Sequence, residues 1–201
     1  MLFFFWLFTS FSLFASEPHV EPIVTEAEWV LIAGIKWATR NVDAPGTFAA
    51  RPEDIGMHYQ WNRKNGWSTG NPMVNSKNRT KWNHSYFFGT IWKKAKDPCP
   101  RGWRVPTATE LESLANTANE LTTINGVNGR IFGTDDNILF LPASGFRDNS
   151  DGTLYNWDSY GYYWSSSVSL DDVYYLFFGS TTAFTSFSDY AYGFCVRCVA
   201  E

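Results

Sequence analysis

The side chains that could act as nucleophiles are three consecutive serines at positions 165–167 and the cysteine Cys195. Nucleophilic catalysis needs a base within hydrogen-bonding reach of the attacking group, usually a histidine held in place by a third side chain. The two candidate bases, His58 and His84, stand in no sequence context that pairs either one with a nucleophile. We therefore predict no catalytic residue, and we expect the serine hydroxyls to satisfy backbone groups at the end of a strand.

Structural zinc sites are recognised in a sequence by cysteine and histidine ligands at short spacings. His58 and His84 are each isolated from any second histidine. The sequence Asp-Asn-Ser-Asp-Gly at 148–152 resembles the start of a calcium loop, but glycine takes the fifth position, where such a loop carries aspartate or asparagine. We interpret this stretch as a solvated turn, and we predict neither a metal nor another cofactor.

The three cysteines, Cys99, Cys195 and Cys198, raise the question of a disulfide. Residues 194–199 alternate as a strand, so a bridge between Cys195 and Cys198 would span roughly 10 Å, whereas bridged Cα atoms lie within about 7 Å. The alternation places Cys198 on the more apolar face and Cys195 on the other. We predict a bridge between Cys99 and Cys198, and the alternative is three reduced, buried cysteines.

Aromatic side chains make up 18% of the chain, and several lie in stretches rich in asparagine and glycine, where exposed loops are expected. Exposed tryptophan and tyrosine rings can stack on sugars or anchor a protein partner. The candidate ligand-binding residues from these stretches are Trp67, Trp82, Trp92, Tyr155, Trp157 and Tyr160. The alternative for each ring is that it covers a sheet beneath a long loop.

Residues 97–114 predict the main helix and a rigid approach to it. Three prolines, at positions 98, 100 and 106, restrict the backbone before the helix. Thr107 and Glu110 have the spacing of a capping box, and Leu111 and Leu114 follow on one apolar face. We expect the helix to end near residues 116–119.

The last third of the chain predicts an antiparallel sheet. Apolar or alternating runs at 138–142, 161–167, 174–178 and 192–199 are separated by turn residues. A hairpin or a bent strand pair is expected within residues 29–42, and the dipeptides Asn125-Gly126 and Asn128-Gly129 both predict turns.

The length of 201 residues suggests a single domain, and the net charge of −4 argues against nucleic-acid binding, which relies on clustered lysine and arginine. Residues 1–16 begin with an uncharged apolar run and are predicted to be a signal peptide or an uncleaved membrane anchor. Residues 17–28 are expected to form a tether, and residues 29–201 the domain. The bulk of the chain should then lie outside the cytoplasm, secreted or in the cell envelope, with membrane contact only through an uncleaved N-terminal segment.

Five motifs occur in order along the chain: Trp-Ala-Thr-Arg-Asn-Val at 37–42, Cys-Pro-Arg-Gly-Trp-Arg-Val-Pro-Thr at 99–107, Leu-Pro-Ala-Ser-Gly-Phe-Arg at 141–147, Tyr-Trp-Ser-Ser-Ser at 163–167 and Val-Arg-Cys-Val at 196–199. Together they resemble the Fibrobacter succinogenes major paralogous domain family, which is common in surface and secreted proteins of Bacteroidetes. The resemblance covers residues 29–200. It implies an α+β fold similar to the C-type-lectin-like and formylglycine-generating-enzyme folds, with a small twisted antiparallel sheet, one or two helices and long irregular loops.

The resemblance implies little about activity, because that family has no established one. We expect a secreted or cell-surface binding or adhesion module without catalysis, whose partner is a glycan or a surface protein. The alternative is an extracytoplasmic enzyme on a fold similar to that of formylglycine-generating enzymes.

Overall fold

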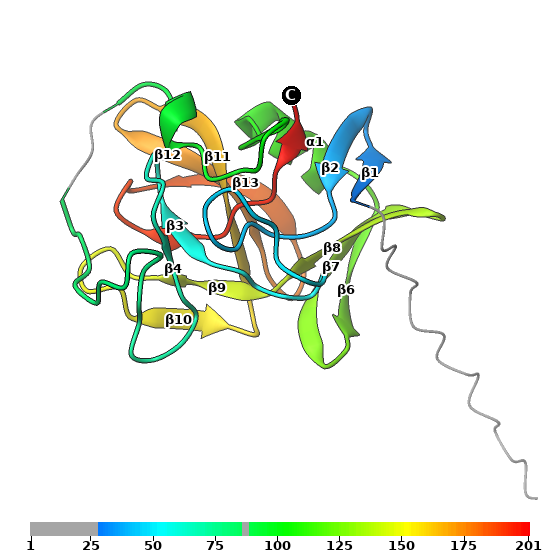
Figure 1. Cartoon of the computed structure of the whole chain (residues 1–201). Coiled ribbons are helices and arrows are strands. Elements are labelled where there is room, and N and C mark those ends of the chain that lie inside the picture. The colour runs from blue at the N-terminus through cyan, green and yellow to red at the C-terminus, as the bar shows by residue number, and fades with distance from the viewer. Residues whose placement is uncertain (1–27, 86–88) are drawn as a thin grey trace, which may run out of the picture.

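The computed structural model describes residues 28–85 and 89–201, shown in colour in Figure 1. The predicted leader at 1–16 and the predicted tether up to residue 27 lie outside the described residues. Within the described residues, no helix is both long enough and apolar enough to cross a membrane.

The described chain is built mainly of strands arranged in four antiparallel sheets. The first sheet has the order β1-β2-β15-β5 and contains β1 (Trp29–Ile32), β2 (Ile35–Ala38), β5 (Trp103–Arg104) and β15 (Val199–Ala200). The second has the order β10-β9-β14-β3-β4 and contains β3 (His58–Gln60), β4 (Gly66–Trp67), β9 (Ser144–Arg147), β10 (Leu154–Trp157) and β14 (Gly193–Phe194).

The other two sheets are three-stranded meanders. One consists of β6 (Asn119–Ile124), β7 (Val127–Thr134) and β8 (Asn137–Pro142). The other consists of β11 (Gly161–Ser169), β12 (Asp172–Phe178) and β13 (Ala183–Ser188). In Figure 1 the β6–β7–β8 sheet lies on one side of the molecule and the β9–β10 pair on the other, and the C-terminal strand β15 lies beside β2.

The expected α+β, C-type-lectin-like fold is wrong for this chain. The described residues contain one α-helix, α1 (Ala108–Ala115), and one short 3₁₀ turn, η1 (Lys94–Lys96), against four separate antiparallel sheets. Residues 119–134, for which only turns were expected, form the hairpin β6–β7 around Asn125 and Gly126, whose φ angles of 50° and 80° suit a two-residue hairpin turn. The second predicted turn, at Asn128-Gly129, instead lies inside β7, where an added Cβ on Gly129 would come within 2.4 Å of the Leu141 carbonyl oxygen.

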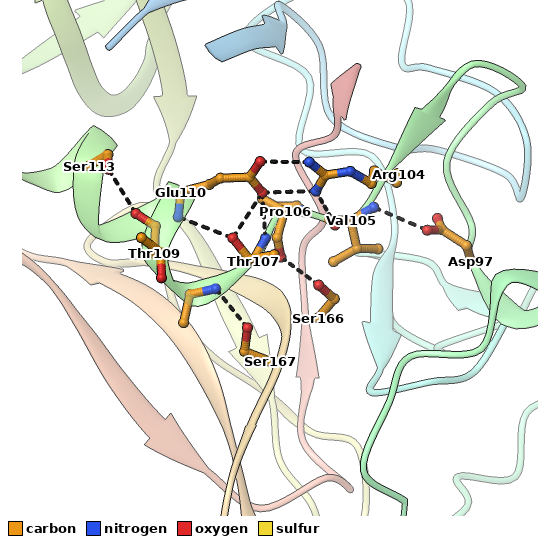
Figure 2. Close-up of polar contacts among 11 residues, drawn as sticks. Asp97, Arg104, Val105, Pro106, Thr107, Thr109, Glu110, Ser113, Ser166 and Ser167 are labelled. Atoms are coloured by element: carbon orange, nitrogen blue, oxygen red, sulfur yellow. Dashed lines mark hydrogen bonds and ion pairs between the residues drawn. The ribbon is translucent and has the colours of Figure 1, made fainter. Parts of the chain in front are cut away.

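The predicted start of the helix is confirmed (Figure 2). Thr107 Oγ1 accepts from the Glu110 backbone amide, and a Glu110 carboxylate oxygen accepts from the Thr107 amide at 2.7 Å. Two further bonds, of 2.8 and 2.6 Å, join the Arg104 guanidinium to the same carboxylate. Burial alone would raise the pKa of Glu110, but hydrogen bonds from Arg104 and Thr107 outweigh it and lower that pKa.

The predicted disulfide is confirmed as well: Cys99 is bonded to Cys198, with Cα atoms 6.1 Å apart. The strand predicted over residues 192–199 is interrupted, because only Gly193–Phe194 and Val199–Ala200 are strands and they belong to different sheets. The alternation that led to the pairing is nevertheless visible in the core. Phe194, Val196 and Cys198 pack in one buried cluster, while Cys195 and Val199 pack in another. Residues 194–199, which we call the last segment of the chain, therefore run between two apolar clusters, and both faces of this segment are buried.

Candidate functional site

The hydroxyl groups of the serines at 165–167 serve the backbone, as the sequence predicted. Ser167 Oγ accepts from the Ala108 amide at the first turn of α1, at 3.0 Å, and Ser166 Oγ donates to the Pro106 carbonyl at 3.1 Å (Figure 2). Ser165 Oγ accepts from the Ser167 amide. Ser166 and Ser167 therefore hold the start of the helix against β11, whereas the Ser165 bond lies within β11.

Cys195 is a free and fully buried thiol. Burial raises the pKa of this thiol to about 12, so the reactive thiolate form is absent at neutral pH. Although Cys195 and Cys198 have Cys-x-x-Cys spacing, Cys198 is already bonded to Cys99. This arrangement supports packing rather than redox chemistry for Cys195.

The prediction of no catalytic residue did not take one motif into account: Gly-Trp-Ser-Thr-Gly at 66–70 matches the Gly-x-Ser-x-Gly pattern of nucleophile elbows. Such an elbow joins a strand to a helix and exposes the serine hydroxyl. Here β4 leads into a loop, and Ser68 Oγ accepts from the Val74 amide at 3.0 Å. Ser68 therefore closes a local turn, and the context that the motif requires is missing.

His58 is the candidate base to consider for Ser68, because it pairs with Trp67, the residue before this serine. It is fully buried in β3. Its Nε2 lies 3.0 Å from the Ser144 carbonyl oxygen, so Nε2 carries the proton, and no described residue offers a hydrogen bond to Nδ1. Burial, together with the nearby positive charge of Arg147, lowers the pKa of His58 to about 4. The imidazole is thus neutral at pH 7 and is not bonded to Ser68.

Three of the six candidate aromatic residues are part of the packing. Trp67 and Trp82 are only 3% and 5% exposed, and their ring centroids lie 4.9 Å apart. Trp82 Nε1 donates to the Asn149 carbonyl at 3.1 Å, which ties its loop to the turn that follows β9. Trp92 is half-buried with its ring 5.3 Å from that of Trp61. The rings of Trp67 and Trp82 therefore present no stacking face to solvent.

The other three candidates are exposed, but the structure separates them into two surfaces. Tyr155 and Tyr160 are 49% and 37% exposed and contact the rings of Phe146 and Phe177, respectively. Trp157 is 61% exposed and contributes to depressions that neither tyrosine lines.

The backbone of β10 explains this separation. In a regular strand, Tyr155 and Trp157 would share one face, because side chains alternate. Asn156 between them has a φ of 56°, and Gly145, opposite it on β9, has a φ of 60°. A Cβ on Gly145 would lie 2.5 Å from the Trp157 backbone nitrogen, so the close approach requires glycine. This left-handed step turns the Trp157 ring away from the surface that carries Tyr155.

Trp157 stands between two adjoining depressions, of about 720 and 580 Å³, which also share Ile55 and Thr69. We call them together the Trp157 groove. The larger part is lined both by apolar side chains, such as Met73 and Leu154, and by polar ones, such as Asn71, Thr80 and Asp151. The smaller part is lined by the four acidic residues Asp43, Glu53, Asp54 and Asp158, with Ala50 and Val127.

Arg147 holds the wall of the larger part in place. It is 3% exposed, and its guanidinium donates to the carbonyls of Ser68, Gly70 and Gly152. Burial lowers the pKa of Arg147, but no titration is expected near neutral pH. Because its donors are bonded to loop carbonyls, Arg147 positions the two loops rather than offering a charge to a ligand.

The smaller part of the groove is negatively charged. Arg51 forms ion pairs with Glu53 and Asp54, with N–O distances of 3.3 and 3.0 Å. Among the described residues, no lysine or arginine pairs with Asp43 or Asp158. The groove thus combines a large exposed ring with hydrogen-bond acceptors, and it disfavours anions. Within the described residues, no cluster of histidine, cysteine and acidic side chains suits a metal ion.

Comparisons with models of protein families, with curated proteins and with solved structures gave no match for this chain. The resemblance to the Fibrobacter succinogenes major paralogous domain family therefore stays a prediction that rests on its five ordered motifs.

Proposed function

We propose that this protein is an extracytoplasmic binding module that holds an uncharged carbohydrate chain in the Trp157 groove. The observation that carries the proposal is the Trp157 ring, 61% exposed between two depressions whose linings combine apolar side chains with hydrogen-bonding groups. An aromatic face offers an apolar surface to the C–H side of a sugar ring, and bound sugars leave their hydroxyls at the edge of that contact.

The groove lining supports this class of ligand. Sugar hydroxyls are hydrogen-bond donors, and the carboxylates of Asp43 and Asp158 together with the Asn71 amide and the Thr69 hydroxyl are acceptors. The same carboxylates would repel an acidic polysaccharide. Two adjoining depressions favour a chain of sugars over a single residue.

A location outside the cytoplasm is supported by the Cys99–Cys198 disulfide, because such bridges persist in oxidising compartments. Fractionation of the native host, followed by detection of the protein with an antibody, would test this part of the proposal. Recovery of the protein only in the cytoplasmic fraction would contradict it.

The ligand can be tested by affinity electrophoresis of the purified domain in gels that contain neutral polysaccharides, with an acidic polysaccharide gel in parallel. We expect retardation by at least one neutral polysaccharide and none by the acidic one. Trp157→Ala should abolish the retardation, and Trp157→Phe should retain part of it, because a smaller ring remains.

Trp29→Ala is the matched control, since Trp29 is another exposed tryptophan, 44% exposed, on β1 and outside the groove lining. This variant should migrate as the unaltered protein does. Unchanged retardation of Trp157→Ala, or the absence of retardation in every neutral gel, would refute the proposed site.

A further inference from the structure

The strand β13 forms an open edge of the β11–β12–β13 sheet. It pairs along its length with β12, from Ala183 opposite Phe178 to Ser188 opposite Val173. No other described strand pairs with β13. The outer backbone groups of β13 are therefore available to a further strand.

The side chains of β13 show what this edge is suited to contact. Phe184 and Phe187 are 46% and 57% exposed, and they lie three residues apart in a strand whose register is regular. They therefore point to opposite faces of the sheet, Phe184 beside Phe177 and Phe187 beside Tyr174. A ligand on one face would cover one of these rings, whereas a neighbouring strand at the edge would flank both.

The usual protection of an open edge is missing from β13. Its sequence, Ala-Phe-Thr-Ser-Phe-Ser, has no charged residue and no proline, and its pairing with β12 has no bulge. By contrast β6, which forms an edge of the β6–β7–β8 sheet, carries the exposed charge of Glu120. Unprotected, uncharged edges are the places where sheets join.

We infer that β13 pairs antiparallel with β13 of a second copy of this chain, so that two three-stranded sheets become one continuous sheet. The uncharged strand lets two molecules of net charge −4 meet without repulsion at the contact. With a two-fold axis through Ser186, Thr185 lies opposite Phe187 of the second copy, and Phe184 lies opposite Ser188. Opposed side chains then point to the same face of the joined sheet. Such a contact uses the same edge on both molecules, so the assembly closes as a dimer.

The inference is independent of carbohydrate binding and is tested by the mass of the purified domain in solution, measured by light scattering over a dilution series. We expect twice the mass of one chain at high concentration and dissociation on dilution. Phe184→Lys/Phe187→Lys should shift the midpoint of dissociation to at least roughly tenfold higher concentration, because lysines at an edge oppose strand addition and the two charges at position 187 would be diagonal neighbours across the pair.

Leu170→Lys is the matched control, because Leu170 is 97% exposed and lies outside β13, and it should dimerise as the unaltered chain does. If the double lysine variant fails to fold, as judged by near-ultraviolet circular dichroism, Ser186→Cys provides a second measurement. It should form a disulfide-linked dimer under mild oxidation. A monomer at all concentrations, together with no cross-link in Ser186→Cys, would overturn the inference.

Discussion

At the scale of single residues, identical side chains have different roles because each meets a different backbone. Trp82 is buried because Gly152 leaves space for it: a Cβ on Gly152 would lie 2.6 Å from the Trp82 ring. Trp157, which has the same side chain, is exposed because the left-handed Asn156 turns it outward. Composition identified all of these tryptophans as candidates, but it contains no information on which glycine or asparagine each ring would meet.

His58 makes stability depend on pH in the mildly acidic range. The imidazole in the unfolded chain binds a proton below its ordinary pKa of 6.5, whereas the buried imidazole binds one only near pH 4. Stability from this group is therefore fully present above pH 6.5 and is lost as the pH falls towards 4. Between pH 7 and 5 we expect a loss of about 2 kcal/mol in the free energy of unfolding, measured with urea.

The control for this prediction is His58→Gln, whose side-chain amide can still donate to the Ser144 carbonyl but does not titrate. Its free energy of unfolding should change little between pH 7 and 5, whatever its absolute value. A decline as steep as that of the unaltered protein would assign the pH dependence to other groups.

At the scale of elements, the local start of the helix was predictable and its tertiary support was not. The capping box depends on residues three positions apart, so the sequence alone identifies it. The bond from the Ala108 amide to Ser167 Oγ joins residues 59 positions apart, and no local pattern reveals it. The helix start is therefore capped partly by itself and partly by β11.

Ser167→Ala should lower the free energy of unfolding by about 1 kcal/mol, because the Ala108 amide loses its hydrogen-bond acceptor. Ser169→Ala, on the same strand, is the control and should have a smaller effect. Urea unfolding of both variants provides the comparison. Equal effects of the two substitutions would show that the bond to the helix contributes nothing measurable.

The five motifs that carry the family resemblance meet around the last segment of the chain. The Ala38 amide donates to the Cys198 carbonyl, the Trp164 amide to the Cys195 carbonyl, and Cys99 is bonded to Cys198. Gly193, just before this segment, pairs with Arg147. These motifs therefore belong to the scaffold of the fold. The Trp157 groove is lined mostly by residues outside them, so the motifs do not indicate a ligand.

At the scale of the whole molecule, the Cys99–Cys198 bridge closes a loop with a sequence separation of 99. In the chain-entropy view, such a bridge stabilises the fold by about 4–5 kcal/mol, because it restricts the unfolded chain. Cys99→Ser/Cys198→Ser should therefore unfold at a markedly lower urea concentration than the unaltered protein. Reductant should lower the midpoint of the unaltered protein and leave that of the variant unchanged.

Cys195→Ala is the control for the bridge, since it removes the buried thiol and leaves the disulfide intact. Its urea midpoint should still fall when reductant is added. If complete reduction, verified by mass, leaves the midpoint of the unaltered protein in place, the bridge does not stabilise the fold.

The sequence by itself determined the features that depend on near neighbours: the capped helix start, the strands β8, β11 and β12, the turn at Asn125-Gly126 and the two faces of the last segment. The disulfide followed from those two faces, because the alternation of apolar residues is a local property with a long-range consequence, and it holds here although residues 196–198 lie outside any strand.

Only the tertiary structure decided that the strands divide into four sheets, that Trp67 and Trp82 are buried, and that Trp157 is exposed between two depressions. The physical reason is that burial and strand pairing depend on contacts between distant segments. The bond between Trp82 and Asn149 spans 67 positions, and those between Arg147 and Ser68 span 79. No spacing within a short stretch of sequence encodes such contacts, although they shape the groove that we propose as the binding site.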